Sequence, residues 1–300
     1  MHSRGSQVWL AAAALLFTTA LFTTATWGMP WAVSPTGDAS QPGVGGLALA
    51  PAPVAVTTAT AKPRSAATPA ITMAPRSAFV VGIGDSVTSA TACACTGFVE
   101  SYAAHLPTAA GGPAREVNLG IGGLTADGLR VLMTEPSPTA RRVAQGDILL
   151  VTIGANDLTP LLSRWRASGC PVTCYSPAVD AVGSDVRAIL TAAKDLRGNG
   201  PTQILVTNYW NVFADGDIAR ASDGSAYLRW SDELTRAVNR RICSVARNAG
   251  ALCVDLYAPF KGDGSRNPTA LLAADGDHPN AAGNQLIAST LLAATATVFR

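Results

Sequence analysis

The chain has 300 residues, and its 22 Lys and Arg residues nearly balance 20 Asp and Glu residues, which leaves a formal net charge of +2. The length allows one or two domains. Because the charge is near neutral and no basic stripe or recognition module is present, the sequence argues against nucleic acid as a partner.

Residues 1–27 predict a signal peptide or an N-terminal membrane anchor. Residues 1–7 are polar and mildly basic, and residues 8–27 carry no charge. No clear small-x-small cleavage site follows directly, so cleavage of the segment and its retention as an anchor both stay open. Its terminal position argues against a buried core helix. We expect the protein to be secreted, or attached to the outer face of the cell membrane by this segment.

Residues 28–76 are rich in Pro, Ala, Thr and Gly. Such a composition cannot pack a core, and it predicts a disordered linker or a wall-spanning tether. We therefore expect a single folded domain over residues 77–300, which is long enough to bury a good core.

Within that domain, five short apolar runs have the pattern of strands that are buried on both faces, as in a parallel sheet. The runs are residues 78–84, 115–120, 147–154, 203–209 and 251–257. Three helical faces accompany them, formed by Val182, Val186, Ile189, Ala193 and Leu196, by Trp230, Leu234, Val238, Ile242 and Val245, and by Leu286, Ile287, Thr290 and Leu291. This alternation predicts an α/β fold, a three-layer α/β/α sandwich around a doubly wound, five-stranded parallel sheet.

Ligands of such sheets bind outside the carboxyl ends of the strands. Asp85 and Ser86 follow the first predicted strand, residues 118–123 (NLGIGG) end the second, and residues 154–157 (GAND) follow the third. We expect these segments to meet at one edge of the sheet. Ser86 is the candidate nucleophile there, and it needs a base, a group that orients the base, and donors for an oxyanion. Asp85 is expected only to shape the turn.

His278 is the predicted base. Of the three histidines, His2 precedes the apolar segment and His105 ends a predicted helix, whereas His278 lies in a polar loop after the last strand. Asp275 can reach the His278 ring across a single turn, so it is the predicted orienting carboxylate. Its alternative is a loop or helix-cap carboxylate. Asp277 is adjacent to the histidine and is expected to be solvated.

The predicted oxyanion donors are the Ser86 N–H, the glycines after the second strand, and the side-chain amide of Asn156. Asn156 follows the third strand directly. Its alternative role is an Asx-turn that caps the next segment. Asp157 is expected to hold the same loop.

Six cysteines lie in the predicted domain, and an even count behind an export segment favours disulfides. Cys243 with Cys253 is the favoured pair, because one should end a helix and the other lie in the next strand. Cys170 with Cys174 would close a short loop, which leaves Cys93 and Cys95 for each other, and a crossed pairing stays open. A metal site is disfavoured, because the spacings match no standard zinc motif.

With these residues assembled, the sequence resembles the SGNH, or GDSL-type, hydrolase family. Four blocks occur in the family's order, namely GDS at 84–86, NLGIGGLT at 118–125, GAND at 154–157 and DGDHP at 275–279. Each block alone is weak, but four in order at predicted strand ends and loops are a strong signal. The resemblance covers about residues 78–300, and CACTGFVESYA after the nucleophile is similar to exported bacterial members.

The resemblance implies a flavodoxin-like SGNH hydrolase fold with a catalytic triad. In that triad Ser86 would be the nucleophile, His278 the base and Asp275 the third member. It also implies an oxyanion hole that is formed by the N–H groups of Ser86 and Gly123 and by the Asn156 amide.

The sequence departs from the family pattern in two places. Val87-Thr88 replaces the more usual Leu-Ser after the nucleophile, and Gly122 stands where a serine often precedes the glycine of the second block. Neither departure removes a catalytic group. Whether Gly122 or Gly123 supplies the oxyanion donor stays open.

These features predict a serine esterase that works through an acyl-enzyme and needs no metal or organic cofactor. Short-chain or carbohydrate O-acyl esters are the favoured substrates, because no long hydrophobic lid follows Ser77. A lipase or phospholipase, a cell-envelope O-acyltransferase, and a non-catalytic surface binding module are the alternatives. The protein is expected to be a monomer.

Four side chains are candidates for a substrate pocket. They are Tyr209 and Trp210 in NYWNVF, and Trp165 and Arg166 in SRWRASGC. The alternative is that the aromatic side chains cover the edge of the core.

Overall fold

The computed structural model describes residues 77–107, 112–198, 200 and 202–296. The predicted signal or anchor segment (1–27) and the predicted linker (28–76) lie outside these residues. In the described part of the chain, no helix is both long enough and apolar enough to cross a membrane.

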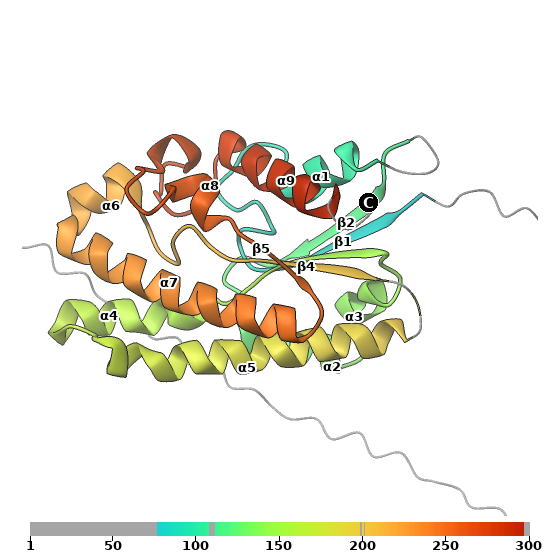
Figure 1. Cartoon of the computed structure of the whole chain (residues 1–300), viewed down its shortest axis with the longest axis horizontal. Coiled ribbons are helices and arrows are strands. Elements are labelled where there is room, and N and C mark those ends of the chain that lie inside the picture. Colours follow the sequence, from blue (N-terminus) through green and yellow to red (C-terminus); the bar gives the residue numbers. More distant parts are fainter. Residues whose placement is uncertain (1–76, 108–111, 199, 201, 297–300) are drawn as a thin grey trace, which may run out of the picture. The chain divides into compact units, whose positions relative to one another are not determined.

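A parallel sheet forms the centre of the domain (Figure 1). Its strands are β1 (Phe79–Gly84), β2 (Arg115–Gly120), β3 (Ile148–Thr152), β4 (Gln203–Thr207) and β5 (Leu252–Val254). They are ordered β2-β1-β3-β4-β5, and every neighbouring pair is parallel. This arrangement confirms the predicted doubly wound sheet of five strands.

Three strands end earlier than the apolar runs that predicted them. β3 ends at Thr152, β4 at Thr207 and β5 at Val254. The apolar side chains beyond these ends, among them Ile153 and Leu256, are still buried. A run of apolar residues indicates that the chain is buried, but it does not indicate which residues form hydrogen bonds between strands. The run therefore does not show where the chain leaves the sheet.

Helices cover both faces of the sheet. They are α1 (Phe98–His105), α2 (Ala126–Thr134), α3 (Pro138–Val143), α4 (Thr159–Ser168), α5 (Val172–Arg197), α6 (Gly216–Ser222), α7 (Gly224–Asn248), α8 (Tyr257–Lys261) and α9 (Ala281–Ala296), with short 3₁₀ helices at Asn156–Leu158 and Thr269–Leu271. Figure 1 shows α1 and α9 on one face and α2, α3, α5 and α7 on the other, and α1 packs on α9 while α5 packs on α2 and α7. The domain is therefore the predicted three-layer α/β/α sandwich.

The predicted helix faces form much of the core. On α5 and α7, nine of the ten predicted positions are buried, and Leu196 is half-buried. On α9, Ile287 and Leu291 are buried and Leu286 and Thr290 are half-buried. These helix faces therefore hold the sheet, and with it the carboxyl ends of the strands, in place.

Gly84 allows β1 to end directly beside β3. Its φ is +141°, a conformation that favours glycine. A Cβ at this position would lie 1.9 Å from the Thr152 carbonyl oxygen, so a larger residue could not keep the pairing of Gly84 with Thr152. The close approach places Asp85 and Ser86 at the carboxyl edge of the sheet.

The cysteines pair as the sequence favoured. Cys93 bonds to Cys95, Cys170 to Cys174, and Cys243 to Cys253. Cys243 lies on α7 and Cys253 on β5, so the third disulfide joins a surface helix to the sheet.

We expect reduction with dithiothreitol to lower the melting temperature. The sequence separation of Cys243 and Cys253 is ten residues, and a loop of that size contributes about 2–3 kcal/mol to the free energy of unfolding. For a domain of this size the loss corresponds to roughly 5–10 °C. Thermal melts with and without reductant, and on the double variant Cys243→Ala/Cys253→Ala, measure the effect. An unchanged melt, together with titratable thiols in untreated protein, would contradict the disulfides.

Candidate active site

Ser86 lies in the turn after β1, and backbone hydrogen bonds hold this turn to the sheet. The Asp85 N–H donates to the Thr152 carbonyl on β3 (3.0 Å), and the Ser89 and Thr91 N–H groups donate to the carbonyls of Asp85 (3.1 Å) and Ser86 (3.0 Å). The Ser86 N–H has no hydrogen-bond partner among the residues that the structure describes. It is therefore free to act as a donor to a ligand.

Ser86 lines a cavity of about 390 Å³ that also contains other predicted site residues. Asn156, Asp275 and His278 reach the same cavity from segments that are far apart in the sequence. The rest of the wall is mixed, with apolar side chains (Val87, Leu162, Trp210, Val212, Phe213) and polar ones (Thr159, Arg166, Asn211, Asp223, Asp277). The expected meeting is therefore observed for the ends of the first and third strands and the last loop, whereas none of residues 118–123 lines the cavity.

Asp275 and His278 form a hydrogen-bonded pair within one turn. The His278 Nδ1 atom lies 2.7 Å from Asp275 Oδ2, and Asp275 Oδ1 accepts from the backbone N–H groups of His278 (3.1 Å) and Asp277 (3.0 Å). Burial raises the pKa of Asp275, but these hydrogen bonds outweigh burial and hold the pKa below its ordinary value. The carboxylate therefore stays charged, and it holds a proton on Nδ1 so that Nε2 is the free acceptor.

Ser86 and His278 line the same cavity. No hydrogen bond joins the Ser86 hydroxyl to the His278 ring within the described ranges. Such contacts are often long in ligand-free enzymes and tighten when substrate binds. Transfer of the Ser86 proton to His278 requires the serine hydroxyl and a ring nitrogen to come within hydrogen-bond distance.

Asp277 is only partly exposed, so its carboxylate is less solvated than the sequence suggested. Its side chain is half-buried and lines the cavity, and burial raises the pKa of its carboxyl. The turn closes tightly around the Asp275 carboxylate, with Gly276 at φ +70°, and this closure brings Asp277 and His278 to the same cavity. Within the described residues no hydrogen bond reaches the Asp277 carboxylate.

Asn156 begins the short 3₁₀ helix that follows β3, and it lines the cavity. Its Nδ2 atom donates to the Leu124 carbonyl at 2.9 Å. An amide nitrogen has two hydrogens, so one stays available for a ligand. The contact also ties the glycine turn after β2 to Asn156.

Gly123 occupies a turn that favours glycine. Its φ is +78°, and the turn is closed by the Leu124 N–H, which donates to the Ile121 carbonyl at 3.1 Å. Gly123 is exposed and is not among the residues that line the cavity. In the described part of the chain, neither the Gly122 nor the Gly123 N–H has a backbone hydrogen-bond acceptor. The choice between them as donor therefore stays open.

Tyr209 and Trp210 both line the cavity, yet both are almost fully buried, with 2% and 1% of their surface exposed. The Tyr209 hydroxyl donates to Asp85 Oδ2. The Trp210 ring stacks on Phe260, with ring centroids 4.3 Å apart. These two aromatic residues therefore form the inner wall of the cavity and part of the core at once.

The other pocket candidates separate into a core residue and a wall residue. Trp165 stacks on Trp230 at 5.3 Å between centroids and is absent from the cavity lining. Arg166 does line the cavity, where its guanidinium pairs with Asp223 at 2.8 Å. This pair joins α4 to the segment between α6 and α7.

Two residues that the sequence set aside have structural partners. Both oxygens of Asp157 accept from the Ala126 N–H, at 3.1 and 2.9 Å, and so anchor the start of α2. His105 ends α1, and its Nδ1 atom lies 2.8 Å from the Ser101 carbonyl. Both observations match the structural roles that were expected.

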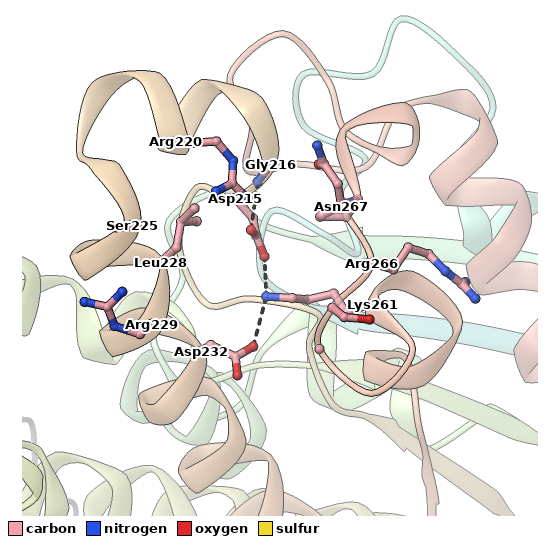
Figure 2. Close-up of a pocket in the computed structure, with 13 residues that line it drawn as sticks. Asp215, Gly216, Arg220, Ser225, Leu228, Arg229, Asp232, Lys261, Arg266 and Asn267 are labelled. Carbon is pink, nitrogen blue, oxygen red and sulfur yellow. Dashed lines mark hydrogen bonds and ion pairs between the residues drawn. The ribbon is translucent and has the colours of Figure 1, made fainter.

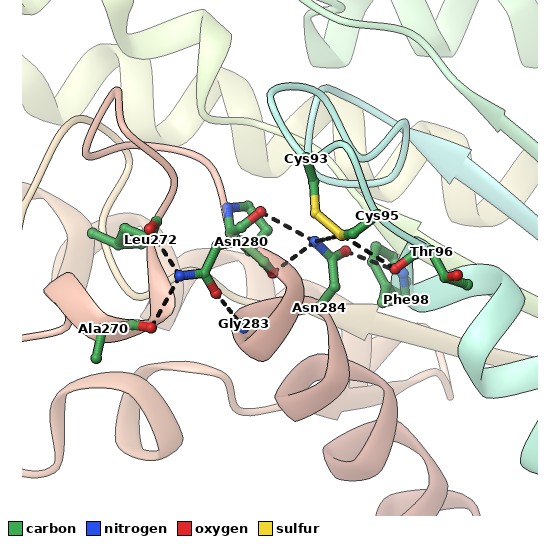
Figure 3. The surroundings of a disulfide bond; sticks show 10 residues. Cys93, Cys95, Thr96, Phe98, Ala270, Leu272, Asn280, Gly283 and Asn284 are labelled. Atoms are coloured by element: carbon green, nitrogen blue, oxygen red, sulfur yellow. Dashed lines mark hydrogen bonds between the residues drawn. A yellow bond between two sulfur atoms is a disulfide. The ribbon is translucent and has the colours of Figure 1, made fainter.

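Asn284 is a site-supporting residue that the sequence reasoning missed (Figure 3). It lies on α9 and is fully buried. Its Oδ1 atom accepts from the Phe98 N–H (3.1 Å), and its Nδ2 atom donates to the Pro279 carbonyl (3.1 Å) and contacts Cys95 Sγ (3.9 Å). One side chain thus links the segment after Ser86 to the loop of His278. A polar residue on an apolar helix face was the available signal.

A second cavity, of about 260 Å³, has none of the predicted site residues in its wall (Figure 2). It contains the buried Lys261, whose Nζ atom lies 2.6 Å from Asp215 and 3.0 Å from Asp232. The cation is therefore paired internally. Among the described residues, no group of three or more His, Cys, Asp or Glu side chains is placed to hold a metal ion.

The parallel sheet with helices on both faces, and the cavity at its carboxyl edge, are the architecture of an SGNH hydrolase. The model of the GDSL-like Lipase/Acylhydrolase family matches residues 83–286. The chain belongs to this family, as its sequence blocks indicated. No curated protein matches the chain.

Solved structures of esterases and lipases share this fold. The lipase Lip_vut3 from a goat rumen metagenome is 18% identical, with a TM-score of 0.59 over 73% of this chain and 97% of that one. A catalytic mutant of Axe2, an acetylxylan esterase from Geobacillus stearothermophilus, is 21% identical, with a TM-score of 0.51 over 74% of this chain and 96% of that one. At these identities the likeness concerns the fold alone.

Proposed function

We propose that this enzyme is a serine esterase that hydrolyses carboxylic esters through an acyl-enzyme on Ser86. The observation that carries the proposal is the pair of His278 and Asp275 on the wall of the cavity that also contains Ser86 and Asn156. Solved structures of Axe2 include catalytic mutants of a serine, an aspartate and a histidine, which are the same three residue types.

In the proposed reaction, His278 Nε2 takes the proton of the Ser86 hydroxyl as the oxygen attacks the ester carbonyl carbon. The negative charge on the carbonyl oxygen is stabilised by the Ser86 N–H, the Asn156 amide, and the N–H of Gly123 or Gly122. His278 then gives its proton to the leaving alcohol, which leaves Ser86 acylated. Water, deprotonated by His278, attacks the acyl-enzyme and releases the acid.

Small acyl groups on a polar alcohol, such as a sugar, are the substrates that we propose. The cavity wall contains the Asp277 carboxylate and the pair of Arg166 and Asp223, which suit a polar alcohol better than a long acyl chain. A carboxylate without a protein donor suits a hydroxyl of the substrate. The alternative functions are a lipase or phospholipase, an O-acyltransferase and a non-catalytic binding module, and the experiments on substrate and labelling distinguish them.

We further propose that the protein works outside the cytoplasm as a monomer, secreted or attached to the outer face of the membrane. Support comes from the apolar character of residues 8–27 and from the three disulfides, which persist in oxidising compartments.

A panel of esters that vary in acyl length and in alcohol tests the substrate class. We expect acetyl esters of sugars with free hydroxyls to be turned over, and long-chain esters to be poor substrates. In Asp277→Asn, the ratio of kcat/KM for a sugar acetate to kcat/KM for p-nitrophenyl acetate should fall about tenfold, since one charge-assisted hydrogen bond is lost. Asp195→Asn, on the exposed side of α5, is the matched control.

Two results would redirect the proposal. A preference for long acyl chains would favour a lipase, and transfer of the acyl group to an added sugar instead of water would favour an acyltransferase. A wild-type protein that turns over no ester and leaves Ser86 unlabelled by a fluorophosphonate would indicate a binding module.

A further inference from the structure

Asp85, next to the nucleophile, is a buried carboxylate with three hydrogen-bond donors around it. It has no exposed surface. Its Oδ1 atom accepts from the Val87 N–H (3.0 Å) and from the Thr152 hydroxyl (2.8 Å), and its Oδ2 atom accepts from the Tyr209 hydroxyl. A buried carboxylate is costly unless its oxygens are paired in this way. The expected role of shaping the turn does not explain the bond to a tyrosine 124 residues away.

Asp85 and Tyr209 lie beside the segment that carries Asn156. Asp85 bonds both the carbonyl and the hydroxyl of Thr152 at the end of β3, and Tyr209 lines the same cavity as Ala155, the residue before Asn156. The Tyr209 backbone is itself fixed by Asn239, which accepts from its N–H (3.0 Å) and donates to its carbonyl (2.7 Å). The Tyr209 hydroxyl thus holds Asp85 in the Ser86 turn, and Asp85 is held in turn to the strand that leads to Asn156.

We propose that Asp85 and Tyr209 are positioning residues, whose hydrogen bond locks the turn that carries Ser86 to the segment that carries Asn156. This inference rests on the proposed esterase function. The two segments supply the nucleophile and two of the proposed oxyanion donors, so their relative position sets the geometry of the transition state. Misplacement of such groups by about 1 Å can reduce a rate about 100-fold.

The lock depends on the charge of Asp85. Burial raises the pKa of Asp85 to about 6, although the donors Tyr209, Thr152 and Val87 pull it in the opposite direction. Both carboxylate oxygens already face donors, so a proton on Asp85 must displace or reverse one of these bonds. All of these hydrogen bonds to Asp85 are therefore present above its pKa, and at least one of them is lost as the pH falls through about 6.

Other ionisable groups act on the same pair. The charge of Asp277 raises the pKa of Asp85 further, and the charge of Asp157 acts on Tyr209. His278 and Asp275 line the same cavity. A test must therefore compare variants that leave these groups in place.

Tyr209→Phe removes the donor and keeps the ring. With p-nitrophenyl acetate as substrate, we expect kcat to fall about 10- to 100-fold with a smaller change in KM, because the loss concerns the transition state. The acidic limb of the kcat profile should move to higher pH by about one unit, because the carboxylate has lost a charge-assisted donor.

Two further comparisons separate positioning from a general effect on the cavity. Tyr227→Phe is the matched control, because the Tyr227 hydroxyl lies in the same cavity but donates to the Ala214 carbonyl (2.9 Å), and its acidic limb should stay in place. Thr152→Val should move the limb upwards as Tyr209→Phe does, whereas Thr152→Ser keeps the hydroxyl and should restore the wild-type limb. If a thermal melt shows that Tyr209→Phe is unfolded, Thr152→Val and Thr152→Ser still measure the effect of a lost donor on the acidic limb.

An acidic limb that stays in place in Tyr209→Phe and Thr152→Val, or that moves equally in Tyr227→Phe, would overturn the positioning role alone. A wild-type enzyme without turnover and without fluorophosphonate labelling of Ser86 would instead overturn the proposed function, and the positioning role with it.

Discussion

Replacing Ser86 with alanine is expected to reduce ester turnover about 10⁴- to 10⁶-fold, because no acyl-enzyme can form without the hydroxyl. The residual rate would come from the oxyanion donors and substrate binding. Ser86 is half-buried at the end of β1 and its hydroxyl makes no hydrogen bond within the described residues, so the melting temperature should stay close to that of the wild type. Steady-state kinetics together with thermal melts measure both quantities.

A fluorophosphonate probe gives the complementary result. The wild type should be labelled at Ser86, as located by mass spectrometry of the digested protein, and Ser86→Ala should not react. Ser184→Ala, an exposed serine on α5, is the matched control. Turnover in Ser86→Ala within about tenfold of the wild type would remove Ser86 as the nucleophile, since catalytic serines contribute far more than that.

Asn156→Ala is expected to lower kcat by about 10² to 10³, with little change in KM. The reason is that its amide would bond the oxyanion, whose charge develops only in the transition state. Because the same amide nitrogen also donates to Leu124, part of the loss could reflect a shift of the glycine turn.

The fluorophosphonate reaction gives a second measure of the oxyanion hole, independent of ester turnover. Its adduct on Ser86 also places an oxygen in the oxyanion hole, so the labelling rate of Asn156→Ala should fall in step with kcat. Asn248→Ala, at the exposed end of α7, is the matched control. A near-normal kcat in Asn156→Ala would leave the residue with a structural role alone, namely its hydrogen bond to the Leu124 carbonyl.

Much of the fold could be predicted because a parallel sheet that is buried on both faces leaves a strong local pattern. The run at residues 147–154 contains four consecutive apolar residues at 148–151, and the α7 face recurs with helical spacing from Trp230 to Val245. The weakest of the five runs, REVNLG, forms β2, an edge strand whose residues are exposed or half-buried.

The site was predictable only as far as short motifs reach. Asp275 and His278 are three residues apart, so their contact follows from local geometry, and the structure contains it. The orientation of Asp277 depends on a tight turn that composition does not reveal. The bond between Tyr209 and Asp85 joins positions that no local pattern connects, which is why the sequence suggested only a pocket wall or the core edge for Tyr209.

The position of Asn284 has a consequence for how the enzyme loses activity. The side chain on α9 is the bridge between the Ser86 side and the His278 side of the cavity, whereas the sheet depends mainly on contacts among its own strands and with α1 and α7. Partial opening of α9 would therefore separate nucleophile and base while most of the core remains folded. We therefore expect mild denaturant or heat to abolish ester turnover under conditions in which the circular dichroism spectrum is still nearly that of the native protein.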